Sequence, residues 1–416
     1  MKLAGVKAGE PRRYGIPINS RRMLAASLAV VALVVLYLWL VHGSLSRLLL
    51  ALGFGKVPLH DYYYFFYPMG EKLLREPKPV EGFLYSPFAA LFFLPFGQLP
   101  YQVSGYLWAL ILALLAGALA REAAHFGCSR PALSVLGVAL TLSSFPLLHD
   151  LKFGQVSVLT VFFLCASADL YDRKYGLAAA ACLAFAASFK AYPLFFLSYF
   201  VIKRDWRFVA ATLGFVFALL IVVPVAALGS AETWAFYADV ARQLHVRFGA
   251  GVSDVNSQSF ESLGERLLFR PLGINSFLVH SLFTTLRYVF CGLLLFGLHR
   301  FVRRPEFSAR DTFLWLFLAT PFVVATSWPH YFVYLPLAVV GTLGMLERIR
   351  LPEPRRRVAL GCLTIAAVLS NIVFFDCVHD RRFYVASGLL FIGNFTAIIA
   401  LGIVASSRNL TAESIS

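Results

Sequence analysis

Long apolar runs, separated by short polar and charged stretches, repeat along the whole chain. A helix needs about 20 mostly apolar residues to cross the hydrocarbon core of a bilayer, with a range of roughly 17–25. Twelve runs fit or approach this length, so the pattern predicts a polytopic membrane protein of all-α class. The runs cover residues 24–42, 102–120, 132–148, 155–170, 176–190, 192–202, 207–228, 277–299, 312–327, 330–346, 358–375 and 385–405.

Two apolar segments are shorter than a membrane span requires and contain proline or lie beside it. The run 192–202 is short and is separated from its predecessor by Pro193, so 176–202 is either two spans or one kinked helix. The run 83–96 is also short for a span and contains Pro87 and Pro95. We expect 83–96 to form an interfacial or re-entrant helix rather than a transmembrane one.

Composition supports the membrane class. Apolar residues make up 59% of the chain and charged residues only 14%, against about 45–50% and about 25% in an average soluble protein. This composition excludes a disordered chain, and six cysteines in 416 residues exclude a small disulfide scaffold. The net charge of +15 suggests a nucleic-acid partner, but the membrane class excludes one.

The distribution of the charge predicts orientation, because cytoplasmic loops collect Lys and Arg. With 83–96 left out of the membrane, most basic residues fall on the same side as both termini. We therefore expect a plasma-membrane protein with a cytoplasmic N-terminus (1–23) and C-terminus (406–416) and a single transmembrane domain over 1–416. The two large loops, 43–101 and 229–276, are then outside.

The first apolar run has two interpretations. It follows Arg21 and Arg22, as a signal peptide would, but it is longer than the usual apolar region and no small-residue cleavage site follows. We expect a retained membrane anchor.

Polar residues in and beside the spans gather on the predicted outer side. Burying such groups in a membrane costs several kcal/mol unless they are paired or serve a function. They comprise Asp61, Tyr62, Tyr64, Tyr85, Asp150, Lys152, Gln155, Lys190, Asn256, Gln258, Arg266 and His330.

Each of these residues also has an ordinary structural explanation. Asp61 suits a solvated loop or a helix cap, and the tyrosines suit an interfacial aromatic belt. Lys190 can extend from an apolar helix to the lipid headgroups, and His330 can end a helix beside Pro329. Separate structural roles would scatter such residues over both faces, so their gathering on one face favours a shared site.

The residue types in this group indicate a reaction. Cationic side chains bind phosphate, aromatic faces pack against sugars, and a carboxylate can take a proton from an attacking hydroxyl. A phosphate leaving group needs no general acid, so one base and several cations suffice for transfer from a lipid phosphate. The chain has no G-x-S-x-G, P-loop, HExxH or CxxC motif, and we expect neither a metal nor a cofactor.

The order of these motifs resembles glycosyltransferase family 87. The motifs are Asp61 before an aromatic run, Tyr85-Ser86-Pro87, Gly154-Gln155, Lys190 three residues before Pro193, Asn256-Ser257-Gln258-Ser259 and a late His330. Members of the family are polytopic GT-C glycosyltransferases, typified by polyprenol-phosphate-mannose-dependent α-(1→2)-mannosyltransferases. The resemblance runs from about Arg22 to Pro352, although Ser86 replaces a family proline and Ser157 a common asparagine.

The resemblance implies roles for individual residues. Asp61 would be the catalytic base, and His330 would belong to the active site. Lys152, Lys190, His330 and Arg266 would hold the donor phosphate, while the tyrosines between 62 and 67, together with Tyr85, would shape the sugar pocket. The reaction would be inverting and independent of metal.

The expected substrates are a polyprenyl-phosphate sugar donor, with mannose the expected sugar, and a hydroxyl on a glycolipid or glycan acceptor. Transfer would take place at the outer face of the membrane. Two other functions stay open: a transporter or flippase of a lipid-linked sugar, and a scaffold of an envelope-synthesis complex. A transporter needs functional polar residues near the midplane and on the inner side as well. Arg287 is the only clear charge deep in a predicted span, which disfavours a transporter.

Overall fold

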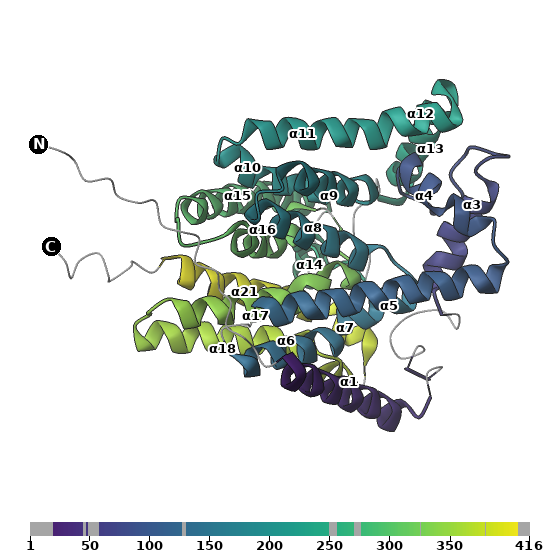
Figure 1. Cartoon of the computed structure of the whole chain (residues 1–416). Coiled ribbons are helices and arrows are strands. Elements are labelled where there is room, and N and C mark those ends of the chain that lie inside the picture. Colours follow the sequence, from purple (N-terminus) through teal and green to yellow (C-terminus); the bar gives the residue numbers. More distant parts are fainter. Residues whose placement is uncertain are drawn as a thin grey trace, which may run out of the picture.

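The computed structural model describes residues 20–44, 47–48, 58–126, 130–248, 256–269, 276–324, 326–378 and 380–406. Within these ranges the secondary structure is helical, apart from one isolated bridge between Ser144 and Asn371. The helices pack lengthwise beside one another, and α3, α4 and α13 gather at one end (Figure 1). The expected all-α integral membrane fold is confirmed.

Five helical segments are long and apolar enough to cross a membrane. All five coincide with predicted spans. They are α5 (Tyr101–Phe126), α11 with η3 and α12 (Trp206–Leu228), the part Ser281–Val302 of α15, η5 with α17 (Pro329–Arg348), and α21 (Leu389–Ser406).

The other helices are shorter or less apolar over the residues whose side chains the structure describes, so the number of spans stays a prediction. Those near predicted spans are α1 (Ser20–His42), α6 (Pro131–Leu142), α8 (Ser157–Asp172), α9 (Gly176–Phe189), η2 (Tyr192–Phe196), α10 (Leu197–Ile202), α16 (Ala309–Val323) and α18 (Glu353–Leu369). The remainder are η1 (Tyr62–Phe66), α3 (Tyr67–Lys72), α4 (Pro87–Gly97), α7 (Phe145–Phe153), α13 (Ser230–Phe248), α14 (Phe260–Gly264), η4 (Glu265–Phe269), α19 (Ile372–Val378) and α20 (Arg381–Ala386).

Two predicted continuous helices, 132–148 and 358–375, are each divided in two. The breaks lie side by side, because Phe145 N donates to Ser370 O and Ile372 N donates to Ser143 O, both at 2.8 Å. Ser and Asn side chains compete for backbone hydrogen bonds and so favour helix ends. The apolar run hides these breaks, and the first of them frees α7 to turn toward the cavity described below.

The segment 83–96 forms α4, an eleven-residue helix that begins at Pro87 behind a Ser86 cap. At 1.5 Å per residue it is about 16 Å long, roughly half the thickness of the bilayer core. This length is short for a span, and the interfacial or re-entrant position of the helix stays a prediction. The N-cap Ser86 also donates from Oγ to Ser188 O at 2.6 Å, which anchors α4 to the end of α9.

The core of the bundle is built from α16 and α17, which are buried on almost every side. A helix that is apolar all round belongs inside a bundle. α5, α8, α15, α18 and α21 pack against this pair and contribute to the same hydrophobic cluster.

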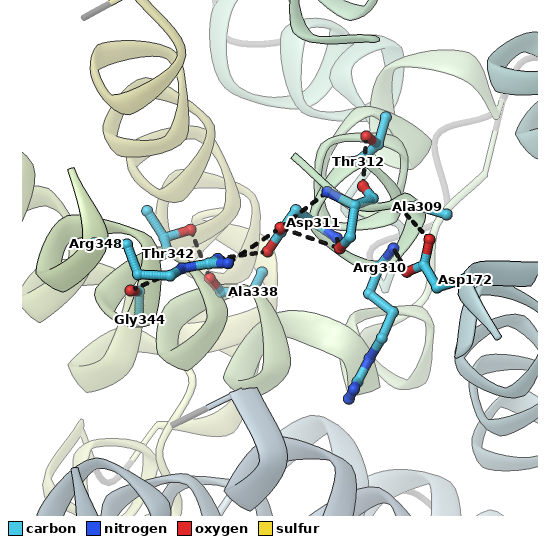
Figure 2. Close-up of polar contacts among 10 residues, drawn as sticks. Asp172, Ala309, Arg310, Asp311, Thr312, Ala338, Thr342, Gly344 and Arg348 are labelled. Atoms are coloured by element: carbon cyan, nitrogen blue, oxygen red, sulfur yellow. Dashed lines mark hydrogen bonds and ion pairs between the residues drawn. The ribbon is translucent and has the colours of Figure 1, made fainter. Parts of the chain in front are cut away.

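Polar contacts join α8, α16 and α17 at the predicted cytoplasmic end (Figure 2). Asp172, at the end of α8, accepts from the backbone N–H groups of Ala309 and Arg310 at 2.9 and 3.2 Å. A carboxylate is favourable there, since it neutralises unpaired N–H groups at the first turn of α16. Asp311 completes a capping box with Ser308 and pairs with Arg348 of α17 at 2.8 Å.

The expected termini and parts of both outer loops lie outside the described residues. These parts are 1–19 and 407–416 at the ends, 45–46 and 49–57 in the first loop, and 249–255 and 270–275 in the second.

Candidate functional site

A cavity of about 610 Å³ lies among α7, α13, the end of α9 and the segments that lead into η1, α4 and η5. Segments far apart in the sequence build its wall. Its polar and aromatic lining, among the residues that the structure describes, comprises His60, Asp61, Phe65, Tyr85, His149, Phe153, Gln155, Phe189, Lys190, Tyr192, Asn256, Thr326, Trp328, His330 and Tyr331.

Asp61 enters this cavity from the turn that precedes η1. Leu59 has a positive φ of 55° and donates its N–H to Lys152 O at 2.6 Å, which fixes the turn against α7. The Asp61 side chain is 17% exposed. Oδ1 lies 3.0 Å from His60 Nδ1, and Oδ2 accepts a hydrogen bond from Gln155 Nε2.

Gln155 reaches Asp61 because of the glycine before it. Gly154 ends α7 in the left-handed conformation, with φ +67° and ψ 32°, and its carbonyl accepts from Trp108 Nε1 at 2.9 Å. Glycine adopts this conformation without a steric cost. The resulting turn returns the Gln155 N–H to Asp150 O at 3.1 Å and leaves the side chain facing the cavity.

Tyr85 approaches from the loop before α4 and donates its hydroxyl to Gln155 Oε1 at 2.8 Å. Burial raises the pKa of the Tyr85 phenol well above its usual value, and the carboxylates of Asp61 and Asp150 raise it further. The hydroxyl therefore stays protonated and available as a donor throughout the physiological range.

A second polar group lies where α7, α8 and α9 meet. Asp150 is fully buried and accepts from the N–H groups of Ser157 and Val158, the first residues of α8, at 3.2 and 3.3 Å. Burial raises the pKa of the Asp150 carboxyl, while the facing Lys190 ammonium and the N–H groups of α8 stabilise the carboxylate and oppose this rise.

Lys190 follows the last residue of α9 in an extended conformation, which turns its side chain inward. Its ammonium donates to Ser157 Oγ at 2.8 Å and lies 3.9 Å from the ring centroid of Tyr331. A cation over an aromatic face gains electrostatic energy, more so away from water. Lys190 is only 6% exposed and lines the cavity, so it does not extend to lipid headgroups.

His330 lies beside Lys190 and is 4% exposed. Its ring stacks on that of His149, with centroids 5.7 Å apart, and neither of its ring nitrogens has a hydrogen-bond partner among the described residues. Buried polar atoms are nearly always hydrogen-bonded. A cavity-lining imidazole without a partner is therefore suited to contact a bound polar ligand.

The structure brings together seven of the residues that the sequence singles out. Asp61, Tyr85, Gln155, Lys190, Asn256 and His330 line the cavity, and Asp150 lies behind Lys190.

Gln258 and Arg266 are bound to the backbone instead. Gln258 Nε2 donates to Val385 O, and Arg266 donates to the carbonyls of Ser257 and Ala386. These bonds attach the segment after Asn256 to α20. Neither side chain is among the lining residues, so their expected contact with phosphate stays a prediction.

Three other predicted residues also lie away from the cavity lining. Tyr62 is fully buried, where it bonds to Ser104 and stacks on Trp108 with centroids 5.8 Å apart. Tyr64 is 57% exposed and stacks on His60, and Lys152 is 1% exposed, 5.3 Å from the Phe153 ring centroid. Their expected role in substrate binding stays a prediction.

Sequence reasoning missed several lining residues. His60 and Phe153 are sequence neighbours of predicted residues, and Trp328 and Tyr331 flank His330 within the segment SWPHY. Their adjacency to predicted residues was the available signal. Nothing in the sequence distinguishes Phe65, which lines the cavity, from the aromatic residues around it.

The fold and the cavity define an all-α integral membrane protein in which a carboxylate, an ammonium group and several aromatic side chains share one cavity. The chain belongs to glycosyltransferase family 87, whose family model matches residues 83–327, more than half of the chain. The resemblance predicted from the motifs is confirmed. The matched range begins after Asp61 and ends before His330, so the placement of those two residues rests on the geometry.

A relative from Mycolicibacterium smegmatis is 31% identical over 167 residues, which are 39% of this chain and 38% of the relative. It is a polyprenol-phosphate-mannose-dependent alpha-(1-2)-phosphatidylinositol pentamannoside mannosyltransferase. The match thus spans about two fifths of the length of each protein.

Proposed function

We propose that the protein is an inverting glycosyltransferase that moves a sugar, mannose, from polyprenyl phosphate to a hydroxyl of a glycolipid or glycan. The observation that carries this proposal is the presence of Asp61 and Lys190 in the wall of one cavity. A base and a cation facing one space are the minimum for transfer from a phosphate donor. The family and the donor named for the relative support the same reaction.

In the proposed reaction, Asp61 takes the proton of the acceptor hydroxyl. The acceptor oxygen then forms a bond to the anomeric carbon while the bond from that carbon to the phosphate oxygen breaks. The electron pair leaves with polyprenyl phosphate, which is a weak base and needs no proton. Attack on the face opposite the phosphate inverts the configuration at the anomeric carbon.

Lys190 and His330 would hold the donor phosphate. The Lys190 ammonium has three N–H donors, of which Ser157 Oγ accepts one, so further donors are available to a phosphate oxygen. His330 can offer a ring N–H, since no described residue accepts one. The Tyr331 and Trp328 rings beside them give the sugar an aromatic surface.

The proposed location of this reaction is the outer face of the plasma membrane. Residues of the two loops that the charge distribution predicts to be outside line the cavity, together with α7, Gln155, the end of α9 and the start of η5. An isoprenoid chain in the outer leaflet reaches a site at that depth without crossing the membrane.

A flippase for a lipid-linked sugar is the second candidate. The sequence offers only Arg287, within α15, as a clear charge deep in a predicted span. Arg287 Nη1 pairs with Glu261 Oε2 at 2.9 Å, and the two side chains are 17% and 4% exposed. This pairing gives the intramembrane charge a structural role and favours the transferase.

A reconstituted assay tests the proposal. The purified protein is given polyprenyl-phosphate mannose with a radioactive sugar and a panel of glycolipid acceptors, and products are separated by chromatography. The proposal predicts free polyprenyl phosphate and a lengthened glycolipid in equal amounts. Movement of the intact donor between leaflets, with no new product, would instead show a flippase.

A further inference from the structure

A chain of three side chains leads from the loop before α4 to the proposed base. The Tyr85 hydroxyl bonds to Gln155 Oε1 at 2.8 Å, and Gln155 Nε2 bonds to Asp61 Oδ2. The three residues come from three separate segments, with 94 positions between Asp61 and Gln155 and 70 between Tyr85 and Gln155.

The chemistry of the three groups fixes the direction of every bond. An ionised carboxylate only accepts hydrogen bonds, so the part of the Gln155 amide that faces Asp61 must be the NH₂ group. The amide oxygen then faces Tyr85, which must donate. The Tyr85 hydroxyl adds a bond at the oxygen end, so the Gln155 amide is held at both ends.

His60 completes the arrangement by bonding to the other oxygen of Asp61. Its Nδ1 lies 3.0 Å from Oδ1, and its ring stacks on Tyr64 with centroids 4.4 Å apart. A carboxylate has about four lone-pair sites, so two remain for an acceptor hydroxyl. Bonds on both oxygens remove rotation about the Cβ–Cγ bond of Asp61.

We propose that Gln155 is a positioning residue for Asp61, and that Tyr85 holds the Gln155 amide in the orientation that this task requires. The inference rests on the proposed function, and it gives Gln155 and Tyr85 a role other than contact with substrate. The two residues act on the rate of the chemical step, because they hold the base in line with the acceptor hydroxyl.

The kinetic effects of four variants test this inference. Gln155→Ala should lower kcat by about 10–100-fold and leave the donor KM within about twofold, since a misplaced catalytic group loses about that much rate. Tyr85→Phe should lower kcat by about 3–10-fold. In the double variant, Tyr85→Phe should add no further loss, because the residue it holds is gone.

The variant Gln155→Glu tests the inference through the pH dependence of kcat/KM, which a substitution at a purely structural residue would leave unchanged. It keeps the volume of the side chain but places a second carboxylate beside Asp61, and adjacent carboxylates share a proton. The acidic limb of the kcat/KM profile should move to higher pH. The other titratable groups facing Asp61 are His60, Tyr85 and Lys190, and all three are retained in this variant.

Control variants distinguish failure of this inference from failure of the proposed function. Gln102→Ala and Tyr175→Phe make the same chemical changes at exposed positions of α5 and of the turn before α9, and both should match the wild type. A raised KM with unchanged kcat, or additive losses in the double variant, would overturn the inference and leave the proposed function intact. Wild-type protein that transfers no sugar would instead remove the proposed function.

Discussion

Gly154 ends α7 directly against Tyr62: a Cβ built on Gly154 would lie 2.8 Å from the Cβ of Tyr62. The contact joins the turn that carries Gln155 to the helix that follows Asp61. Because φ at Gly154 is +67°, the turn needs glycine both for its conformation and for its space.

Gly154→Ala should therefore reduce both stability and activity. The left-handed conformation alone costs about 1–2 kcal/mol for a residue with a Cβ, and relieving the contact with Tyr62 displaces Gln155. We expect a lower melting temperature in detergent and a lower kcat. In Gly117→Ala, on α5, the added Cβ meets nothing within 4 Å, so that control should be neutral or slightly stabilising; equal behaviour of the two variants would contradict the explanation.

The buried Asp150 and Lys190 should depend on each other for stability. Each group favours the charged form of the other, and Asp150 also accepts from the first N–H groups of α8. Loss of such a buried acceptor costs about 1–3 kcal/mol. We expect Asp150→Asn to lower the free energy of unfolding by an amount of this order. Thermal denaturation of purified protein measures the effect.

The double variant Asp150→Asn/Lys190→Met provides the control for that prediction. It removes both charges, so it should recover part of the stability lost in Asp150→Asn, although it should remain inactive in transfer. Strictly additive losses of stability would show that the two groups do not interact.

The capping box at the start of α16 should stabilise the fold without affecting the reaction. Asp311→Ala removes both the cap on Ser308 and the pair with Arg348, and we expect a loss of about 1–3 kcal/mol. Transfer per folded molecule should stay at the wild-type level. The matched control is Glu353→Ala, because Glu353 and its partner Arg357 are both largely exposed and such pairs contribute about 0–1 kcal/mol.

Sequence reasoning was effective where one physical requirement acts over many residues. The demand for apolar residues in the bilayer located the five segments that are long and apolar enough to span it, namely α5, α11 with η3 and α12, α15, α17 with η5, and α21. The same apolar pattern did not reveal where helices are interrupted. Ser143-Ser144 and Ser370-Asn371 interrupt their helices because the two breaks bond to each other, and a pairing across the fold leaves no periodic signal.

In the candidate site, too, the sequence revealed conspicuous residue types but not the local backbone geometry. Asp61, Lys190 and His330 were found because polar groups in apolar surroundings are conspicuous, and all three line the cavity. The aromatic residues were harder to assign. Tyr62 and Phe65 lie in one aromatic run, but the π-helical turn η1 buries Tyr62 and leaves Phe65 at the cavity, and alternating sequence patterns do not predict such a turn.

Transfer should not require a divalent metal ion. The leaving group is a phosphate ester that needs no proton, and the Lys190 ammonium beside His330 supplies positive charge and N–H donors at the proposed phosphate position. We expect turnover to persist after dialysis against EDTA. Loss of turnover with EDTA, followed by recovery with Mg²⁺ or Mn²⁺, would contradict this expectation.

The most direct test of the central claim, that Asp61 is the base of a sugar transfer, is the initial rate of sugar transfer by Asp61→Asn. The substitution keeps the shape of the side chain and one hydrogen-bonding oxygen but removes the ability to accept a proton. With radioactive polyprenyl-phosphate mannose and a glycolipid acceptor, we expect transfer to fall to the background level while the melting temperature and donor binding stay close to the wild type. Transfer at the wild-type rate by the folded variant would contradict the account.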